Sequence, residues 1–275
     1  MSITITNVTV RSFEVTKLAI EWQVQFNSPS DTAKIKYYIE RSFSPTSEFA
    51  LLNADPLIDK YFYVDSDIEL RQKYREYYYR IKVIDENITP SETTYSEVKA
   101  RLPLQLQSTT LVPLEIARNI RIYIEGTTNH RSPIGTSCLL FIRRTFGKFC
   151  DNCYDYLKGR CRLSDCKVCF GTTFDKGFLD PIPTYISLTT FPKQTTLEDT
   201  GEHQLTYTKA DTSNWPVYSP GDVLVTKNNK RLRVIEVQPH ETPEGILIKQ
   251  DLTLLYLTPG DTEYNIPVVL DQFYD

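Results

Sequence analysis

Hydrophobic and polar residues alternate along several short runs in the first hundred residues, and this period of two indicates β-strands. Between residues 18 and 24 the apolar side chains share one face, namely Leu18, Ile20, Trp22 and Val24. The same pattern recurs at 36–41, 77–84 and 96–100, with turn residues between the runs. Short strands separated by turns over about a hundred residues are typical of a β-sandwich. The sequence therefore predicts a sandwich over residues 1–102.

This predicted sandwich carries aromatic residues at characteristic places. Trp22 lies in an early strand, and Tyr77, Tyr79 and Ile81 would point inward from a late strand. In this arrangement the segment resembles a fibronectin type III domain. The resemblance implies that Trp22 and Tyr79, or Tyr77 in its place, pack in the core and bind nothing.

Residues 103–180 form a second predicted segment, whose main element lies between Pro113 and Gly126. Its length favours a helix over 113–125, although alternate isoleucines also suit a strand. In the helix one face would hold Ile116, Ala117, Ile120, Tyr123 and Ile124, and Gly126 would end it. The apolar run 136–144 predicts a buried strand.

Residues 181–275 return to short alternating runs at 185–189, 222–226, 231–237 and 247–257. Asn228 and Asn229 connect the second run to the third, and an Asn-rich connection of this kind indicates a hairpin. We expect these strands to form a small, half-closed β-barrel. The predicted fold class is therefore mainly β: an N-terminal sandwich, a central segment with a short helix, and a C-terminal barrel.

Two cysteine pairs dominate the candidate chemistry. Cys150 and Cys153 form one C-x-x-C pair, and Cys166 and Cys169 form another after twelve intervening residues. Two tight turns with this spacing can present four thiolates tetrahedrally to a structural Zn²⁺ ion. Disulfides and unrelated free thiols are the alternatives. Cys161, between the pairs, is an alternative ligand.

The compartment bears on this choice. The first six residues lack the basic and apolar regions of a signal peptide, so we expect a reducing cytoplasm that keeps thiols free for metal. Cys138 lies in an apolar run, and we expect an inert core thiol there.

The bulk composition excludes several classes of protein. No apolar run approaches the length of a membrane span, and the net charge of −4 predicts no general affinity for nucleic acid. Residues 141–176 hold eight basic and four acidic residues, a local +4 that leaves −8 elsewhere. This indicates a solvated surface that balances a thiolate site; a DNA-facing patch is the alternative.

Catalytic motifs are absent from the sequence. No nucleophile elbow, P-loop or H-E-x-x-H pattern occurs, and we expect His130, His203 and His240 to be surface residues. A zinc ion held by four cysteines has a closed coordination shell, which is structural. The sequence therefore predicts that the protein is not an enzyme.

The cysteine pairs also belong to a longer motif. Asp155 follows the first pair, Phe170-Gly171-Thr172-Thr173-Phe174 follows the second, and Gly177, Phe178 and Pro181 come next. This resembles the signature C-x-x-C-x-D … S-x-C-x-x-C-Y-G-T-G-F … G-G-Y … P of neck proteins in tailed bacteriophages. The chain departs from it at Phe170 for Tyr, and at Thr173 and Lys176 for Gly. Downstream, Gly221-Asp222-Val223-Leu224 and Arg231-Leu232-Arg233-Val234 resemble the hairpin of head-closure barrels.

The resemblance implies a virion structural protein of the neck, joining the DNA-filled head to the tail. It implies a homo-oligomeric ring, six- or twelve-fold, stacked between portal or adaptor and tail terminator or tail proteins. It also implies passive contact with channel DNA, no membrane contact, and residence in the host cytoplasm during assembly. Alternatives are a baseplate or tail-associated component and, in another class, a cytosolic zinc-ribbon adaptor that binds protein or nucleic acid.

Overall fold

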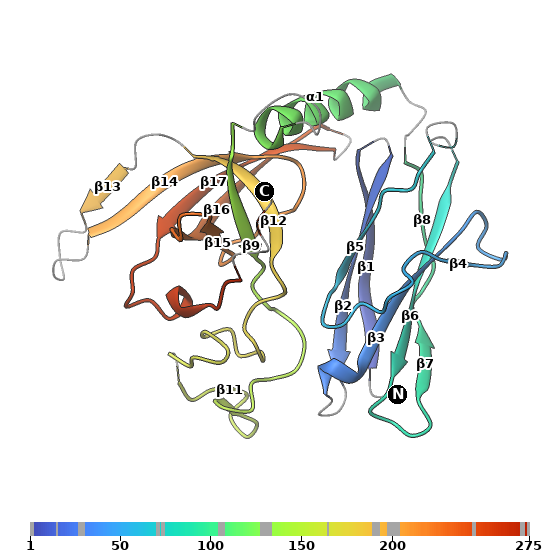
Figure 1. Cartoon of the computed structure of the whole chain (residues 1–275), viewed down its shortest axis with the longest axis horizontal. Coiled ribbons are helices and arrows are strands. Elements are labelled where there is room, and N and C mark those ends of the chain that lie inside the picture. Colours follow the sequence, from blue (N-terminus) through green and yellow to red (C-terminus); the bar gives the residue numbers. More distant parts are fainter. Residues whose placement is uncertain are drawn as a thin grey trace. The chain divides into compact units, whose positions relative to one another are not determined.

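The protein folds mainly into β-strands, as predicted, with 47% strand and 10% helix in the computed structural model (Figure 1). The described residues are 3–14, 16–26, 31–69, 72, 75–103, 108–126, 134–163, 165–188, 193–196, 204–243, 246–269 and 273, without the side chains of 108–111, 193–196 and 204–205. Two compact units result, one of residues 1–111 with 145–149 and the other of 112–144 with 150–275. Across the described ranges, no helix is long and apolar enough to span a bilayer.

The first unit is a sandwich of two antiparallel sheets. One sheet has the order β1 (Ile3–Glu14), β2 (Lys17–Phe26), β5 (Phe62–Asp65). The other has the order β4 (Ala50–Leu51), β3 (Ile35–Ser42), β6 (Tyr77–Asp85), β7 (Glu92–Tyr95), and β8 (Lys99–Arg101) also pairs with β6. The short 3-10 helix η1 (Thr32–Lys34) precedes β3. The two antiparallel sheets form a β-sandwich, as the alternating pattern predicted.

Large aromatic side chains fill the core of the sandwich. Trp22, Tyr77 and Tyr79 are buried, as the resemblance implied. The rings of Trp22 and Tyr37 lie 5.7 Å apart between centroids, and the ring of Tyr61 lies 5.6 Å from that of Tyr37. Each fully buried large apolar side chain stabilises the fold by about 1.5–3 kcal/mol.

A buried ion pair accompanies these rings. The hydroxyl of Tyr79 donates to Asp65 Oδ2 at 2.7 Å, and Arg41 Nη1 lies 2.8 Å from the same oxygen. Burial and the neighbouring carboxylate raise the pKa of Tyr79. The polar end of the tyrosine is thus satisfied inside the core, which is a condition for burying it.

The sequence pattern predicted no strand at β1 and a continuous strand over 96–100, and the structure differs at both places. In β1 the buried residues are Ile3, Val8 and Phe13, because register shifts after Thr6 and after Ser12 change which side chains face inward. Asn7, with φ of 49°, lies in the first of these shifts. The predicted strand 96–100 is interrupted, because the Ser96 hydroxyl accepts the N–H of Ile81 that a continuous ladder would use.

The second unit contains a closed six-stranded barrel. Its order is β12 (Ile182–Leu188), β9 (Thr136–Phe141), β15 (Val223–Thr226), β16 (Arg231–Glu241), β17 (Leu247–Tyr256), β14 (Gln204–Thr212), closed by pairing of β12 with β14. β13 (Lys193–Thr196) extends the sheet from β14, and the 3-10 helix η3 (Thr262–Asn265) follows β17.

The barrel differs from the predicted one in two respects. It is closed, where a half-closed barrel was expected, and it includes β9, which the sequence placed in the preceding segment. Cys138, Leu139, Leu140 and Phe141 are all buried, on both faces of β9. β12 and β15 pair with the two edges of β9, so β9 is an interior strand of the barrel sheet.

The helix predicted over 113–125 forms as α1 (Ser108–Glu125), and Gly126 ends it with φ of 82°. Pro113, the first residue of the predicted helix, lies inside the helix, because α1 begins at Ser108. The buried face carries Leu114, Ala117 and Ile124, whereas Ile116 and Tyr123 of the predicted face are 44% and 58% exposed. The buried face of the helix is therefore turned about the helix axis relative to the predicted face. Its three buried residues are separated by three, seven and ten positions, which places them on one side of a helix.

The predicted hairpin at Asn228–Asn229 joins β15 to β16, and Asn229 adopts a left-handed φ of 56°. The preceding Gly221 also has positive φ, at 95°, and donates its N–H to the Val234 carbonyl at 2.8 Å. Buried Asp222 accepts N–H groups from Arg143 and Ser219 at 2.9 and 2.8 Å. The Gly-Asp pair thus ties the start of the hairpin to Arg143, which follows the end of β9.

Candidate metal centre

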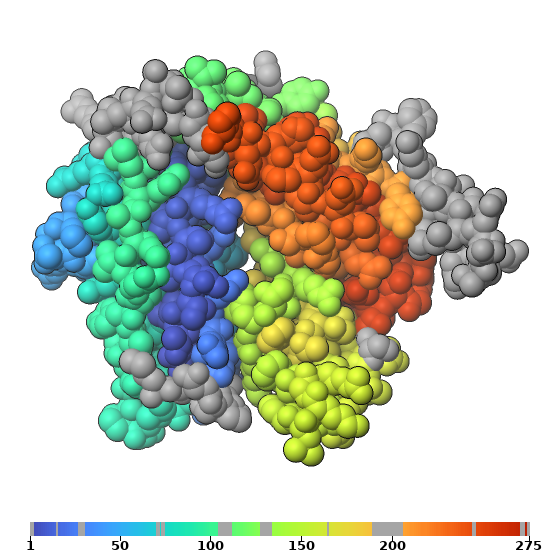
Figure 2. Space-filling model, turned by 180° about the vertical axis from the view of Figure 1, so that it is seen from behind, coloured from blue at the N-terminus to red at the C-terminus, as the bar shows by residue number. Residues whose placement is uncertain are grey.

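The four paired cysteines lie at the tip of the β9–β12 strand pair, in residues 142–180, which we term the cysteine segment. The two arms of this segment continue the pairing of the strands: Arg144 N–H donates to the Gly177 carbonyl at 3.0 Å and Leu179 N–H to Ile142 at 2.9 Å. Arg144 Nε also donates to the Phe178 carbonyl at 3.0 Å. In Figure 2 the described residues of the segment from 150 onward are yellow-green and yellow, next to the orange barrel strands.

Each cysteine pair occupies a tight turn. The N–H of Tyr154 donates to the Cys150 carbonyl at 2.9 Å, and the N–H of Phe170 donates to the Cys166 carbonyl at 2.8 Å. The two turns are joined through Thr173, whose carbonyl accepts the N–H of Cys150 at 2.9 Å. The sequence pattern therefore produces two similar turns that face each other.

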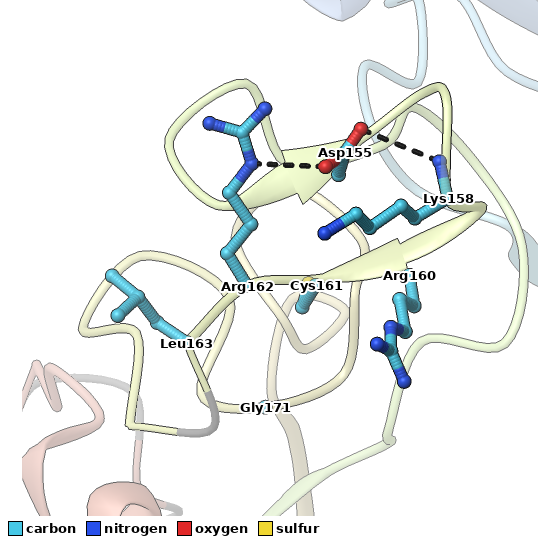
Figure 3. A pocket seen from close by; sticks show the side chains of 7 residues that line it. All are labelled: Asp155, Lys158, Arg160, Cys161, Arg162, Leu163 and Gly171. Atoms are coloured by element: carbon cyan, nitrogen blue, oxygen red, sulfur yellow. Dashed lines mark hydrogen bonds and ion pairs between the residues drawn. The ribbon is translucent and has the colours of Figure 1, made fainter.

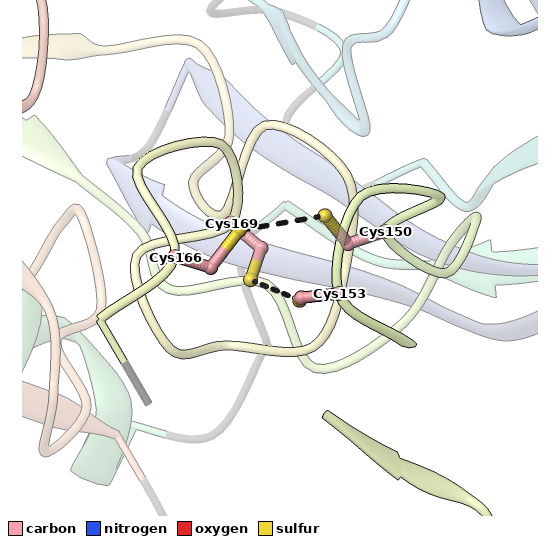
Figure 4. A group of neighbouring side chains, drawn as sticks. All are labelled: Cys150, Cys153, Cys166 and Cys169. Atoms are coloured by element: carbon pink, nitrogen blue, oxygen red, sulfur yellow. Dashed lines mark hydrogen bonds between the residues drawn. The ribbon is translucent and has the colours of Figure 1, made fainter. Parts of the chain in front are cut away.

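The four sulfur atoms converge between these turns (Figure 4). All four lie within 4.8 Å of one another, and the side chains are at most 2% exposed. The Sγ atoms of Cys150 and Cys166 are 3.9 Å apart, and those of Cys153 and Cys169 are 3.4 Å apart. Four sulfurs about 2.3 Å from a central zinc would be about 3.8 Å apart, so the cluster has the size of a tetrahedral thiolate site.

Hydrogen bonds favour the thiolate form at the first cysteine of each turn. Burial opposes ionisation of Cys166, but the Asn152 amide and the N–H groups of Cys169 and Val168 lower its pKa to about 6. Burial raises the pKa of Cys150 to about 11, although the N–H groups of Asn152 and Cys153 act in the opposite direction. Such N–H donors around sulfur are the outer shell that orients metal ligands.

The backbone behind the second turn repeatedly adopts positive φ. The angles are 50° at Phe170, 75° at Gly171, 74° at Thr173, 61° at Lys176 and 66° at Gly177. Thr173 and Lys176 stand where the phage signature has glycine, yet both keep the left-handed conformation. Thr173 and Lys176 therefore adopt, despite their side chains, a conformation that glycine adopts at lower cost.

Gly177 is required by close packing as well as by its conformation. A Cβ atom there would lie 2.5 Å from the carbonyl oxygen of Cys169, closer than real Cβ atoms approach. The absent side chain lets the returning strand pass directly over the second turn. This fixes Cys169 against the arm that leads to β12.

Two aromatic residues connect the segment to the barrel. Phe170 and Phe178 have ring centroids 6.1 Å apart and belong to a buried cluster with the barrel residues Leu139, Phe141, Val223, Val225 and Leu257. Ile266 and Phe273 complete the cluster. Within its described residues the segment shares the apolar core at the end of the barrel, and its own buried cluster consists of cysteines.

A short hairpin lies between the two turns in the sequence. β10 (Tyr154–Asp155) pairs with β11 (Arg160–Cys161), and Asp155 caps the connection by accepting N–H groups from Leu157 and Lys158 at 3.0 and 3.3 Å. Backbone hydrogen bonds and Arg162 lower the pKa of Asp155 against the effect of burial. The role of Asp155 and that of Asn152 escaped the sequence analysis, although the signature marks the aspartate.

Cys161 lies beside the four-cysteine cluster. Its Sγ is 2.9 Å from that of Cys153, and the side chain is only half-buried. It lines an open cavity of about 470 Å³ together with Lys158, Arg160 and Arg162 (Figure 3). Burial raises the pKa of the Cys161 thiol, and Cys169 and Cys166 act in the same direction, whereas the hydrogen bond with Cys153 acts in the opposite direction.

The remaining candidate residues lie elsewhere. Cys138 is fully buried in β9, where burial raises the pKa of its thiol, as expected of a core cysteine. His240 is partly exposed and pairs with Asp251 at 2.7 Å. His130, His203 and the motif residue Ser164 lie outside the described residues.

Comparison with known proteins gives no further assignment. No model of a protein family matches the chain, and no curated protein matches it. What the molecule shows is a mainly β chain with a closed barrel and four buried cysteines that could hold a metal ion.

Proposed function

We propose that this chain is a structural subunit of the neck of a tailed-phage virion, in which a zinc ion braces the tip of the β9–β12 pair. One observation carries the proposal: the cysteine segment and the barrel share one core through Phe170 and Phe178. The Gly221–Asp222 hairpin lies in the same compact unit. The two motifs that resemble phage neck proteins therefore belong to one body.

The chemistry of the cluster favours zinc in a structural role. Four thiolates complete a tetrahedral zinc shell and leave no position for water or substrate. Zinc binding in such sites contributes about 10–16 kcal/mol at neutral pH, which is folding free energy for a segment without its own core. We accordingly propose a non-catalytic protein.

The proposal includes an assembly. The subunit would form a homo-oligomeric ring between the portal or adaptor and the tail, with the virion neck as its location. The basic residues of the cysteine segment would partly balance the thiolates and tolerate passive contact with packaged DNA. The fibronectin III-like unit would serve as an additional contact module.

The metal part is tested by elemental analysis of the full chain purified without added metal. We expect one zinc per chain, lost on substitution of Cys166 and Cys169 by serine and retained in the Cys138→Ser control. Absence of metal from the wild-type chain, or its retention in the double variant, would refute the zinc site.

The virion part is tested by immunogold labelling of phage particles together with light scattering of the purified chain. Label at the junction of head and tail, and a closed oligomer alone or with the neighbouring ring protein, are expected. Label at the distal end of the tail would favour the baseplate alternative. A monomer that binds DNA with a steep dependence on salt would favour the zinc-ribbon adaptor.

A further inference from the structure

Five cysteines gather at a site that needs four ligands. The Sγ atoms of Cys153 and Cys161 are 2.9 Å apart, well below the separation of about 3.8 Å between two sulfurs on one tetrahedral zinc. The pairs Cys150–Cys166 and Cys153–Cys169 are close to that separation. Cys161 is therefore positioned outside the ligand shell while touching one of its members.

Cys161 differs from the four ligands in access. The ligands are at most 2% exposed, whereas Cys161 is half-buried at the wall of the cavity that Lys158 and Arg160 also line (Figure 3). A small molecule that enters the cavity therefore meets Cys161 before it meets any ligand sulfur. The fifth thiol is the exposed end of an otherwise closed cluster.

The backbone holds Cys153 and Cys161 close together, because Cys153 immediately precedes β10 and Cys161 ends β11. Tyr154 pairs with Cys161 across the β10–β11 ladder, and Arg162 N–H donates to the Cys153 carbonyl at 2.8 Å. The two thiols are thus diagonal neighbours on a short hairpin. A disulfide bond is about 2.05 Å long, so the sulfurs need to move by less than about 1 Å to form one.

We propose that Cys161 is an oxidative modification site that removes Cys153 from the metal centre by forming a Cys153–Cys161 disulfide. The oxidant is hydrogen peroxide. The Cys161 thiol attacks the peroxide, an S–O bond forms as the O–O bond breaks, and one water leaves. The Cys153 sulfur then attacks Cys161, an S–S bond forms as the S–O bond breaks, and the second water leaves with a proton from solvent. Two sulfurs lose two electrons, and the peroxide gains them.

The consequence concerns the metal, and it rests on the zinc site proposed above. A disulfide sulfur is no longer a thiolate ligand, so the ion would keep three ligands and dissociate more readily. The cysteine segment would then lose the brace between its two turns. A dithiol reductant would restore both thiols and the site.

The test treats the full zinc-loaded chain with a small excess of hydrogen peroxide and follows zinc release with a chromogenic chelator. Peptide mapping without reduction then identifies the disulfide. We expect a Cys153–Cys161 linkage, zinc release with the same time course, and reversal by dithiothreitol. Cys161→Ser should release zinc at least ten times more slowly, and Cys138→Ser should behave as wild type.

Two outcomes would overturn the proposal. One is a disulfide within either C-x-x-C pair in place of the Cys153–Cys161 linkage. The other is equal zinc release from wild type and Cys161→Ser. A chain that contains no zinc refutes the metal site instead, while the mapped linkage still decides whether these two thiols pair.

Discussion

The sandwich and the cysteine segment achieve order in different ways. The sandwich buries Trp22, Tyr37 and Tyr79 among several aliphatic side chains, with a satisfied ion pair at Asp65. The cysteine segment buries four thiols among turns and contributes Phe170 and Phe178 to another core. The comparison teaches that one chain can combine a part stabilised by apolar burial with a part built around a cluster of four buried thiols that could hold a metal ion.

The largest effect is expected from removing metal ligands. Replacement of Cys150 and Cys153 by serine should abolish zinc binding and expose residues 145–180 to protease, because the segment has no alternative core. The sandwich should stay folded. Limited proteolysis with mass spectrometry checks this, and an unchanged cleavage pattern would contradict it.

The reverse experiment weakens the sandwich alone. Trp22→Ala should reduce its free energy of unfolding by about 3–5 kcal/mol, as expected for a large buried aromatic side chain. Zinc content should remain that of wild type. Urea unfolding followed by tyrosine fluorescence measures the stability, and analysis of the same samples measures the zinc content. Loss of zinc together with loss of stability would show that the sandwich and the cysteine segment are not independent.

The barrel provides an intermediate case through the buried carboxyl of Asp222. Burial raises its pKa to about 6, although N–H donors from Arg143 and Ser219 act in the opposite direction. Its ordinary pKa is about 3.9, so the folded state binds the proton more tightly. This stabilisation is full below pH 4 and is lost as the pH rises to 6, a change of about 3 kcal/mol.

The Asp222→Asn variant isolates this titration. The free energy of unfolding of the wild type should fall relative to that of the variant as the pH rises from 4 to 6. Above pH 6 the difference between the two should stay constant. Urea titrations of both proteins at several pH values measure it. A difference independent of pH would mean that Asp222 does not change its proton affinity on folding.

Two glycines allow close packing to be separated from conformational strain. Gly177→Ala would place a Cβ against the Cys169 carbonyl and should cost at least about 2 kcal/mol, seen as faster zinc transfer to a chelator. Gly159 also has positive φ, at 62°, but nothing lies within 4 Å of its Cβ position. Gly159→Ala should therefore cost about 1–2 kcal/mol of strain and leave zinc transfer nearly unchanged.

The smallest effect is a gain. Thr173 holds a left-handed conformation that costs a β-branched residue roughly 1–2 kcal/mol, so Thr173→Gly should stabilise the cysteine segment by about 1 kcal/mol. Slower zinc transfer to a chelator is the expected readout. Faster transfer would show that the Thr173 side chain contributes more than its backbone strain costs.

The sequence predicted best where one interaction dominates. The inward residues of β2, such as Trp22, and the spacing of Cys150 to Cys169 were sufficient to predict a sandwich and a thiol cluster. Asn7 shows the opposite case, because a bulge changes the side-chain alternation and hides β1 from a pattern with period two. The position of β9 in the barrel depends on pairing with distant strands, which no local pattern encodes.

The site shows the same division. The four ligand candidates follow from spacing, but the contact between Cys161 and Cys153 depends on how the β10–β11 hairpin folds back. Asn152 becomes a donor to Cys166 only once the two turns face each other. The spacing of the cysteines therefore predicts the ligand candidates, and the tertiary structure determines which side chains contact their sulfur atoms.

The pairing of β12 has a consequence for the circumference of the barrel. At one end β12 continues from the arm tied to Arg144, and at the other it meets β14 through Ser187 with Asp211 and Leu188 with Ala210, the two pairs seen in the described part of the chain. One strand thus links the tip that carries the four cysteines to the strand pair that closes the barrel. A change in the length of either arm would shift β12 along its neighbours and alter how wide the barrel can be.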